Sequence, residues 1–222
     1  MTDGTVSLGI KGQELLLHPE CAVVWLRLKT VIVADTHFGK SSYFARHGIA
    51  VPSGTDEADR ARLNRLVRDY GAERLIILGD FLHAPIHANS REAVELTAWA
   101  RELAPTQIVV VAGNHDRGPP QHWSSSISWR EGAWLQEPFC FVHDADRYQI
   151  GTDQTFTLSG HIHPVMRLQD IRKARLRVPV FWQRATGLVL PSFGGFTGGF
   201  AVQAGVTDHL FAVGATAVVR IK

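Results

Sequence analysis

The feature that most constrains this chain is a series of short apolar runs, each followed at once by polar residues. Three of the runs are Thr30-Val-Ile-Val-Ala34, Arg74-Leu-Ile-Ile-Leu78 and Gln107-Ile-Val-Val-Val111. Each has the length of a β-strand and is apolar almost throughout, which is typical of strands covered on both faces. Strands of this kind occur in parallel sheets, so the runs predict an α/β fold.

Two helical patterns separate these strands. Residues 57–71 begin with acidic side chains, where the helix dipole favours anions, and end at a glycine. The apolar side chains of this segment recur at helical spacing at Leu63, Leu66, Val67 and Tyr70. A second helix is expected over residues 90–103, with Asn89 as N-cap, Glu92 as its reciprocal partner and Pro105 just beyond the end. The alternation of strands and helices predicts a parallel sheet with right-handed crossovers.

The other apolar runs predict a chain richer in strands than in helices. They lie between turns rich in glycine and proline, and they cover residues 14–18, 21–27, 139–142, 155–158, 178–182, 188–190, 200–202 and 215–221. No internal repeat, linker or low-complexity tract interrupts the chain. We therefore expect one domain, residues 1–222, built from two packed sheets.

Composition excludes several classes of protein. With 45% hydrophobic and 20% charged residues among 222, the chain is neither disordered nor collagenous. Cys21 and Cys140 lie in apolar runs, as reduced core cysteines do, which suits a reducing compartment. No segment has the ~18 apolar residues of a membrane span and no signal peptide is recognisable, so a soluble, cytoplasmic protein is expected. The net charge of only +2 means that attraction to nucleic acid would need local basic patches.

Five polar clusters follow predicted strands and contain the residue types that bind metals. They are Asp35-Thr-His37, Gly79-Asp-Phe-Leu-His83, Gly113-Asn-His-Asp116, His143-Asp144 and Gly160-His-Ile-His163. Ligands bind at the carboxyl ends of strands in open α/β sheets, where these clusters would converge. Carboxylate, amide and imidazole ligands without thiolates suit Mn²⁺, Fe or Zn²⁺ in an open catalytic site. Because the donors are too many for one ion, a pair of ions bridged by one carboxylate is expected.

Each cluster has an ordinary explanation when taken alone. Asp35 could cap a turn, Gly79-Asp80 and Gly113-Asn114 are common turn sequences, and a lone His143 is more often a hydrogen-bonded core residue than a ligand. The Gly-His-x-His cluster is a stronger signal, since alternate residues of an extended segment point the same way. The occurrence of all five clusters in this order, each after a strand, argues against coincidence.

The ordered set D-x-H, G-D-x-x-H, G-N-H-D, H and G-H-x-H resembles the calcineurin-like metallophosphoesterase superfamily between Asp35 and His163. The resemblance implies a four-layer α/β/β/α sandwich of two packed mixed sheets. It also implies one metal held by Asp35, His37, Asp80 and His163, and a second held by Asp80, Asn114, His143 and His161, with Mn²⁺ as the expected ion. His115 would face the phosphate as a catalytic residue, and Asp116 would orient the His115 ring.

A narrower resemblance involves three further segments. Residues 35–40, 46–54 and 190–199 are similar to the bacterial ligase-associated DNA-damage-response phosphoesterases of the PdeM type. Residues 79–83 are also similar to the nuclease subunit of the double-strand-break repair complex, whose long C-terminal DNA-capping region this chain lacks. These resemblances imply DNA as substrate and DNA ligase or helicase repair proteins as partners.

Candidate substrate-binding residues lie outside the ligand set. His83 and His47 could reach the site, although His83 could equally support other residues and His47 could be a solvated loop residue. Five cations follow the last cluster, and they are Arg167, Arg172, Lys173, Arg175 and Arg177. They would contact a nucleic-acid backbone or, alternatively, form a solvated face.

The sequence thus predicts a dinuclear-metal-dependent phosphoesterase that hydrolyses phosphodiester bonds, as a nuclease associated with DNA repair. One alternative is an enzyme for small substrates, namely a cyclic-nucleotide phosphodiesterase, a nucleotide pyrophosphohydrolase or a phosphomonoesterase. Another is a non-catalytic scaffold, but a scaffold is expected to have lost ligands or the catalytic histidine, and this chain retains both. The oligomeric state stays open.

Overall fold

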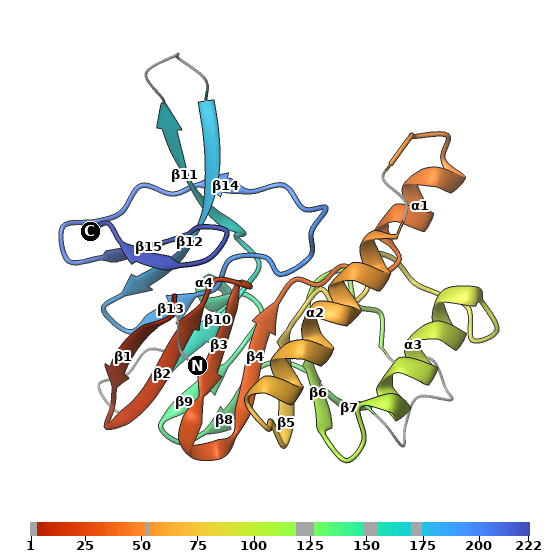
Figure 1. The fold of residues 1–222 in the computed structure, drawn as a ribbon, viewed down its shortest axis with the longest axis horizontal. Coiled ribbons are helices and arrows are strands. Elements are labelled where there is room, and N and C mark those ends of the chain that lie inside the picture. Colours follow the sequence, from red (N-terminus) through yellow and green to blue (C-terminus); the bar gives the residue numbers. More distant parts are fainter. Residues whose placement is uncertain (1–3, 52–53, 119–126, 149–154, 170–174) are drawn as a thin grey trace.

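Two mixed β-sheets dominate the computed structural model, which describes residues 4–51, 54–118, 127–148, 155–169 and 175–222 (Figure 1). The first sheet follows chain order from β1 to β7. Its strands are β1 (Val6–Ile10), β2 (Gln13–His18), β3 (Ala22–Trp25), β4 (Thr30–Ala34), β5 (Arg74–Leu78), β6 (Gln107–Val111) and β7 (Ile127–Arg130). Pairing is antiparallel from β1 to β4 and parallel from β4 to β7, so the predicted parallel core of the sheet is confirmed.

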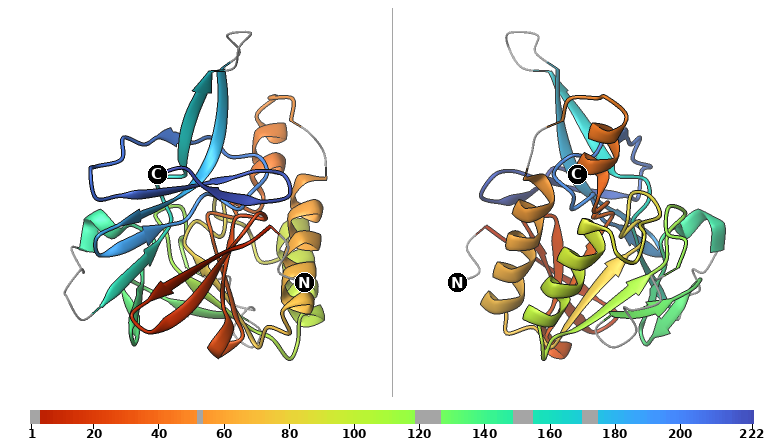
Figure 2. Two further views of the ribbon diagram at one scale, coloured as in Figure 1. Left: turned by 60° about the vertical axis from the view of Figure 1, so that its left-hand side comes forward. Right: turned by 90° about the vertical axis from the view of Figure 1, so that its right-hand side faces the viewer.

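Two long helices, α2 (Thr55–Asp69) and α3 (Arg91–Glu102), lie side by side on the outer face of this sheet (Figure 2). Their apolar sides are buried, as the helical spacing predicts, through Leu63 and Leu66 of α2 and Leu96 and Trp99 of α3. A shorter helix, α1 (Lys40–Arg46), projects beyond the end of the sheet, and η1 (Leu26–Leu28) is a single 3-10 turn. Among the described residues, no helix is long and apolar enough to cross a membrane.

The second sheet has nine strands in the described part of the chain. They are β8 (Trp134–Gln136), β9 (Phe139–Phe141), β10 (Phe156–Ser159), β11 (Pro164–Gln169), β12 (Arg175–Arg184), β13 (Gly187–Val189), β14 (Phe200–Ala201), β15 (His209–Val213) and β16 (Val218–Arg220). The order is β14-β11-β12-β13-β10-β9-β8, with β15 paired to β12 and β16 to β15. The antiparallel hairpin of β11 and β12 projects from the body on the same side as α1 (Figures 1 and 2).

Aromatic side chains fill the space between the two sheets. Trp25 of β3 packs edge-on against Phe139 of β9, with ring centroids 4.8 Å apart, and Phe139 in turn contacts Phe141 and Phe156. All four are buried, as are Cys21 and Cys140, which are both free thiols. Burial of this apolar surface is the main stabilising contribution to the fold. The α/β fold with two packed mixed sheets is confirmed. Beside the second sheet, the helical layer in the described part of the chain is the single-turn helix α4 (Ala145–Tyr148).

Several sequence expectations need correction. The N-cap of α3 is Ser90 rather than Asn89, because the Ser90 hydroxyl accepts the hydrogen bond from the Ala93 amide at 3.2 Å. The strand expected over residues 21–27 ends at Trp25, where η1 begins, and the strand expected over 215–221 is reduced to β16. Patterning did not predict β1, β7, β8, β11, β15 or α1, which are short and in part solvent-exposed.

Candidate metal centre

The five polar clusters meet at one end of the two sheets. Strands β4, β5 and β6 end level with one another, because Ala34 pairs with Leu78 and Leu78 with Val111. The polar residues that follow these strands therefore lie side by side, and those that follow β9 and β10 complete the cluster. The loops also hydrogen-bond to each other, as the amides of Asp35 and His37 donate to the carbonyl oxygens of Gly79 and Asp80.

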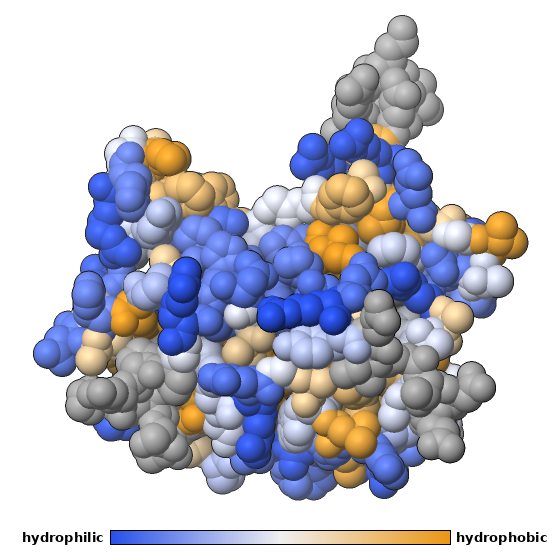
Figure 3. Space-filling model, turned by 180° about the vertical axis from the view of Figure 1, so that it is seen from behind, coloured by the Kyte–Doolittle hydropathy of each residue, from blue (hydrophilic) through white to orange (hydrophobic). Residues whose placement is uncertain are grey.

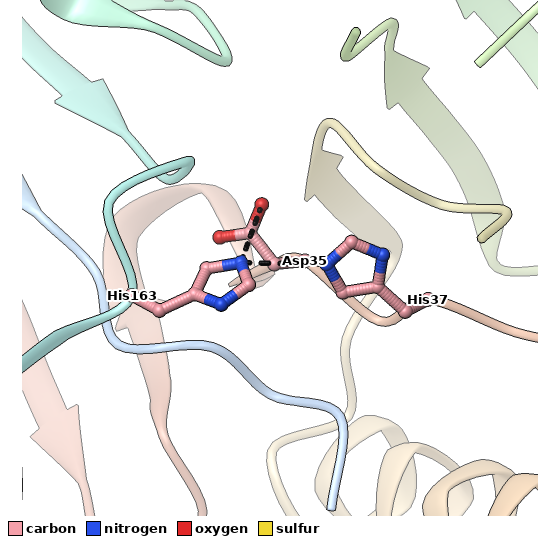
Figure 4. A group of neighbouring side chains, drawn as sticks. All are labelled: Asp35, His37 and His163. Atoms are coloured by element: carbon pink, nitrogen blue, oxygen red, sulfur yellow. Dashed lines mark hydrogen bonds and ion pairs between the residues drawn. The ribbon is translucent and has the colours of Figure 1, made fainter. Parts of the chain in front are cut away.

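One group of possible ligands consists of Asp35, His37 and His163, whose ligand atoms all lie within 4.8 Å of one another. Nε2 of His163 is 3.5 Å from Oδ1 of Asp35 and 3.4 Å from Nε2 of His37. Figure 4 shows both imidazole rings turned toward the Asp35 carboxylate. This carboxylate is fully buried.

A second group consists of Asp80, His143 and His161. Nδ1 of His161 is 3.0 Å from Nε2 of His143, and that nitrogen is 2.9 Å from Oδ1 of Asn114. Asn114 therefore lies beside this group. The backbone amide of His161 donates to the Asp35 carboxylate, which ties the second group to the first.

Asp80 lies between the two groups. Its Oδ1 is 3.6 Å from Nε2 of His143, and its Oδ2 is 3.9 Å from Nε2 of His37. One oxygen thus faces each group. This is the position expected of a carboxylate that bridges two ions.

The chemistry of these donors fits two divalent cations. Asp35 and Asp80 are buried, yet among the described residues neither forms an ion pair with a lysine or arginine. Buried carboxylates are normally paired or bound to metal. Imidazole nitrogens also face one another at 3.0 Å (His161 and His143) and 3.4 Å (His37 and His163), where a shared ion would satisfy their lone pairs.

The backbone at these positions is strained. Five of the candidate ligands have a positive φ between 44° and 72°, and they are Asp35, His37, Asp80, His161 and His163. A left-handed conformation costs a non-glycine residue roughly 1–2 kcal/mol, and such strain concentrates at functional sites. The two sheets therefore hold these side chains in a conformation that an isolated loop would avoid.

In three of the motifs, the residue before the ligand is a glycine because a larger side chain would not fit there. A Cβ on Gly79 would lie 2.1 Å from Nδ1 of His143, and one on Gly160 would lie 2.6 Å from Oδ2 of Asp35. A Cβ on Gly113 would lie 2.3 Å from both the amide nitrogen and Oδ1 of Asp80. Each ligand side chain thus rests against a neighbouring glycine backbone.

Burial keeps His37 in its neutral form. Desolvation lowers the pKa of His37 to about 2, with the nearby His163 and Lys40 contributing in the same direction. Burial also acts to lower the pKa of His163, but the hydrogen bond and charge of Asp35 outweigh it, so that this pKa is raised. A neutral imidazole is the form that binds metal.

His115 faces the centre from the loop after β6. Its amide donates to Oδ1 of Asp80 at 2.9 Å, and its Nδ1 donates to the carbonyl oxygen of His83 at 2.9 Å. The expected contact with Asp116 is corrected, because the Asp116 carboxylate accepts from the amides of Gly113, Phe81 and Leu82. Asp116 thus joins the loops after β5 and β6, and the His83 carbonyl orients the His115 ring.

His83 lies beside His115, whereas His47 lies at the exposed end of α1. The His83 ring stacks on His115, with centroids 5.3 Å apart, and on Phe44 of α1 at 5.5 Å. Burial lowers the pKa of His83 to about 4, and the charge of Lys40 adds to this. His47 is exposed on the end of α1, and its Nδ1 donates to the Tyr43 carbonyl oxygen. No direct contact joins His47 to the ligand groups in the described part of the chain.

The basic stretch lies on the projecting hairpin. Arg167 of β11 and Arg177 of β12 are exposed and directly opposite each other, and Arg177 lines a cavity of 170 Å³ that His163 also lines. Arg175 pairs through its backbone with Gln169. Arg172 and Lys173 lie outside the described residues.

Sequence reasoning missed the loop that supports Asp35. The Ser192 hydroxyl and the Gly194 amide donate to the Asp35 carbonyl oxygen, and the Phe193 amide donates to that of Ala34. On its other side, this loop is held by α2, where Asp59 accepts from the Gly195 amide. The run of glycines from 194 to 199 was the available signal, since it allows the close approach of two backbones.

Known proteins resemble this chain in sequence and in fold. The family model of the calcineurin-like phosphoesterases matches residues 28–199. The structure of nuclease MPE from Pseudomonas putida superposes with a TM-score of 0.80 at 33% identity, over 97% of this chain and 100% of that one.

Two further solved structures match less closely. A protein of unknown function from Aquifex aeolicus has 17% identity and a TM-score of 0.43 over 60% of this chain and 78% of its own. The phosphoesterase Yfce from E. coli has 15% identity and a TM-score of 0.44 over 86% and 96%. No curated protein matches the sequence. The family match over most of the chain, together with the paired Asp and His groups, shows that the chain belongs to the calcineurin-like phosphoesterase family and is a metal-dependent phosphoesterase.

Proposed function

We propose that this phosphoesterase hydrolyses phosphodiester bonds in nucleic acid, with one divalent ion in each ligand group. The observation that carries the proposal is the pair of ligand groups with Asp80 between them, in a chain that is 33% identical to a nuclease over 97% of its length. The first ion would be held by Asp35, His37, Asp80 and His163. The second would be held by Asp80, Asn114, His143 and His161.

The side chains around the centre have distinct tasks. Two divalent ions held by these residues would supply positive charge for the transferring phosphoryl group and would make a water molecule more acidic. His115 donates a proton to the leaving oxygen through Nε2, because its Nδ1–H is already donated to the His83 carbonyl. Because Nδ1 keeps its proton in the hydrogen bond to His83, Nε2 carries a proton only in the imidazolium form of His115. Asp80 fixes the distance between His115 and the ligands by accepting from the His115 amide.

The hairpin arginines support a polyanionic substrate. Like charges directly opposite each other on a pair of strands are destabilising. Arg167 and Arg177 nevertheless face each other, and neither forms an ion pair within the described residues. A phosphate backbone lying along the hairpin would neutralise both. DNA as substrate, Mn²⁺ as the ion and a cytoplasmic role in DNA repair remain parts of this proposal.

The test compares three substrates in one assay. Mn²⁺-dependent hydrolysis is measured for a single-stranded oligonucleotide, a cyclic nucleotide and bis(p-nitrophenyl) phosphate, with chelated protein as the control. The proposal predicts the highest kcat/KM for the oligonucleotide. A higher value for the cyclic nucleotide, with no cleavage of the oligonucleotide, would replace it with a small-molecule phosphodiesterase.

A further inference from the structure

Two cavities border the first ligand group and the loop at residues 194–199. The cavity on the hairpin side is lined by His163, Arg177, Thr197 and Gly198. The narrower cavity on the α1 side is lined by His37, Lys40, Phe196 and Thr197, and also by Asp56 and Asp59 of α2. Each cavity therefore contains one ligand histidine and one cationic side chain, and the two cavities share Thr197. The carboxylates of the second cavity already have partners, since Asp56 accepts from the Gly39 amide and Asp59 is paired with Arg62.

The cation on the α1 side is Lys40, the first residue of that helix. Its side chain is half-buried, and Nζ lies 5.8 Å from the centroid of the Phe196 ring. Lys40 is close enough to lower the pKa values of His37 and His83 by its charge, and the Asp80 carboxylate acts on Lys40 in return. The ammonium therefore lies beside the centre rather than in bulk solvent.

Lys40 has no anion of its own. Among the described residues it forms no salt bridge, whereas Lys29 on the surface is paired with Glu73 at 2.7 Å. Asp80 is the carboxylate whose charge acts on Lys40, but it already lies between the two ligand groups. A partly desolvated ammonium without a counter-charge is unfavourable, and more so beside bound divalent cations. An anionic group of the substrate would remove this cost.

The position of Lys40 is fixed by the fold. The amide of Gly39, just before it, donates to Oδ2 of Asp56 on α2 at 2.7 Å, and its own amide donates to the His37 carbonyl oxygen. Phe44 of α1 also contacts Phe196, with ring centroids 6.1 Å apart. Helix α2 thus holds the base of α1 through Asp56 and the glycine-rich loop through Asp59.

Lys40 lies in the cavity beside His37, and Arg177 lies in the cavity beside His163. Lys40 belongs to α1 and Arg177 to the β11–β12 hairpin, and these two elements project separately from the body. Seen from behind, the surface between the two projections is hollowed and largely hydrophilic (Figure 3). A chain of phosphates lying in this hollow would pass one cation on each side of the metal centre.

We propose that Lys40 and Arg177 bind the phosphates that flank the scissile phosphate, so that the preferred substrate is an oligonucleotide with a charged phosphate on each side of the cleaved bond. This inference rests on the proposed nuclease function and makes it more specific. A cyclic nucleotide or a single diester has no flanking phosphate and would leave both cations unpaired.

The test uses tetranucleotides, whose three linkages allow the central bond to be cleaved and each flanking phosphate to be neutralised separately. The substrates carry an uncharged methylphosphonate at the 5′ flank, at the 3′ flank or at neither, and cleavage of the central bond is measured with the Mn²⁺-loaded protein. The variants are Lys40→Met, Lys40→Arg and Arg177→Gln. The matched controls are Lys29→Met and Arg68→Gln, which remove the same charges from exposed surface positions.

We expect Lys40→Met to raise KM and lower kcat/KM by about 10- to 100-fold, the range for a hydrogen bond to a charged group. A methylphosphonate at the flank that Lys40 contacts should lower the kcat/KM of the wild type by a similar factor. It should cause no further loss in Lys40→Met. Arg177→Gln should show the same dependence on the opposite flank. Lys40→Arg should recover part of the activity, and both controls should behave as the wild type.

Binding supplies a second readout, independent of turnover. The Kd of a labelled oligonucleotide for the chelated, metal-free protein should rise in Lys40→Met and Arg177→Gln but not in the controls. Equal losses for methylphosphonate and phosphate substrates in these variants, with the central bond still cleaved by the wild type, would overturn the flanking-phosphate assignment and leave the nuclease proposal intact. Hydrolysis of bis(p-nitrophenyl) phosphate without cleavage of any tetranucleotide would overturn both.

Discussion

Gly113→Ala should damage the metal centre without touching any ligand. A Cβ at this position would lie 2.3 Å from both the amide nitrogen and Oδ1 of Asp80. Ordinary contact distances are about 3.5 Å, so the carboxylate or the loop must move by about 1 Å. Metal–ligand distances are held within roughly 0.2 Å, and a shift of this size takes the central carboxylate out of range. Overpacking of this kind also destabilises a fold by ~1–3 kcal/mol.

The assay combines metal content with thermal unfolding. For a chain of this size, 1 kcal/mol corresponds to about 2–4 °C in Tm, so we expect a fall of roughly 2–12 °C in chelator together with loss of at least one bound ion. Gly9→Ala is the matched control, because a Cβ there meets nothing within 4 Å. Gly113→Ala protein that binds two ions with wild-type affinity would refute the steric reasoning.

Three further predictions follow from individual side chains. His115→Ala should retain its metal content but lose activity by ~10²–10⁴-fold, with a smaller loss for substrates with good leaving groups; a variant that loses an ion contradicts the assigned role. In metal-free protein, the free energy of unfolding should fall as the pH drops below about 6.5. Burial lowers the folded-state pKa of His37 to about 2, so the unfolded chain binds the proton more readily than the folded one. His37 should therefore contribute a loss of about 1.4 kcal/mol per pH unit. The raised pKa of His163 has the opposite effect, because its contribution to the free energy of unfolding is present at low pH and is lost as the pH rises through that pKa. His37→Asn should therefore flatten the dependence of this free energy on pH below 6.5. An unchanged slope would exclude His37 as its source. Arg167→Gln should lower the salt dependence of oligonucleotide binding by about 0.7 in the slope of log K against log salt, and a slope equal to that of the wild type removes this arginine from the interface.

The parallel part of the first sheet and the position of the centre follow directly from sequence. The runs ending at Ala34, Leu78 and Val111 are long enough and apolar enough to be unambiguous, and in a parallel sheet their polar successors have to meet. Helix α2 was equally predictable from its apolar spacing.

Other features depend on tertiary contacts that no local pattern encodes. The positive φ values of Asp35 and His163 are imposed by the packing of loops from both sheets. Asn89 and Ser90 are both good caps, and only the chain path selects the second. The interaction of Asp116 with three loop amides, in place of the His115 ring, also depends on how the loops after β5 and β6 approach each other.

The most direct test of the account is a titration of metal-free protein with Mn²⁺ in which bound ions and phosphodiester hydrolysis are measured on the same samples. The two ligand groups predict two ions per chain, with hydrolysis appearing as the second is bound. Asp80→Asn replaces the carboxylate between the groups with a neutral amide. This variant should bind fewer than two ions and retain very little activity. Saturation of the wild type at one ion with full activity, or two tightly bound ions in Asp80→Asn, would contradict a dinuclear centre bridged by Asp80.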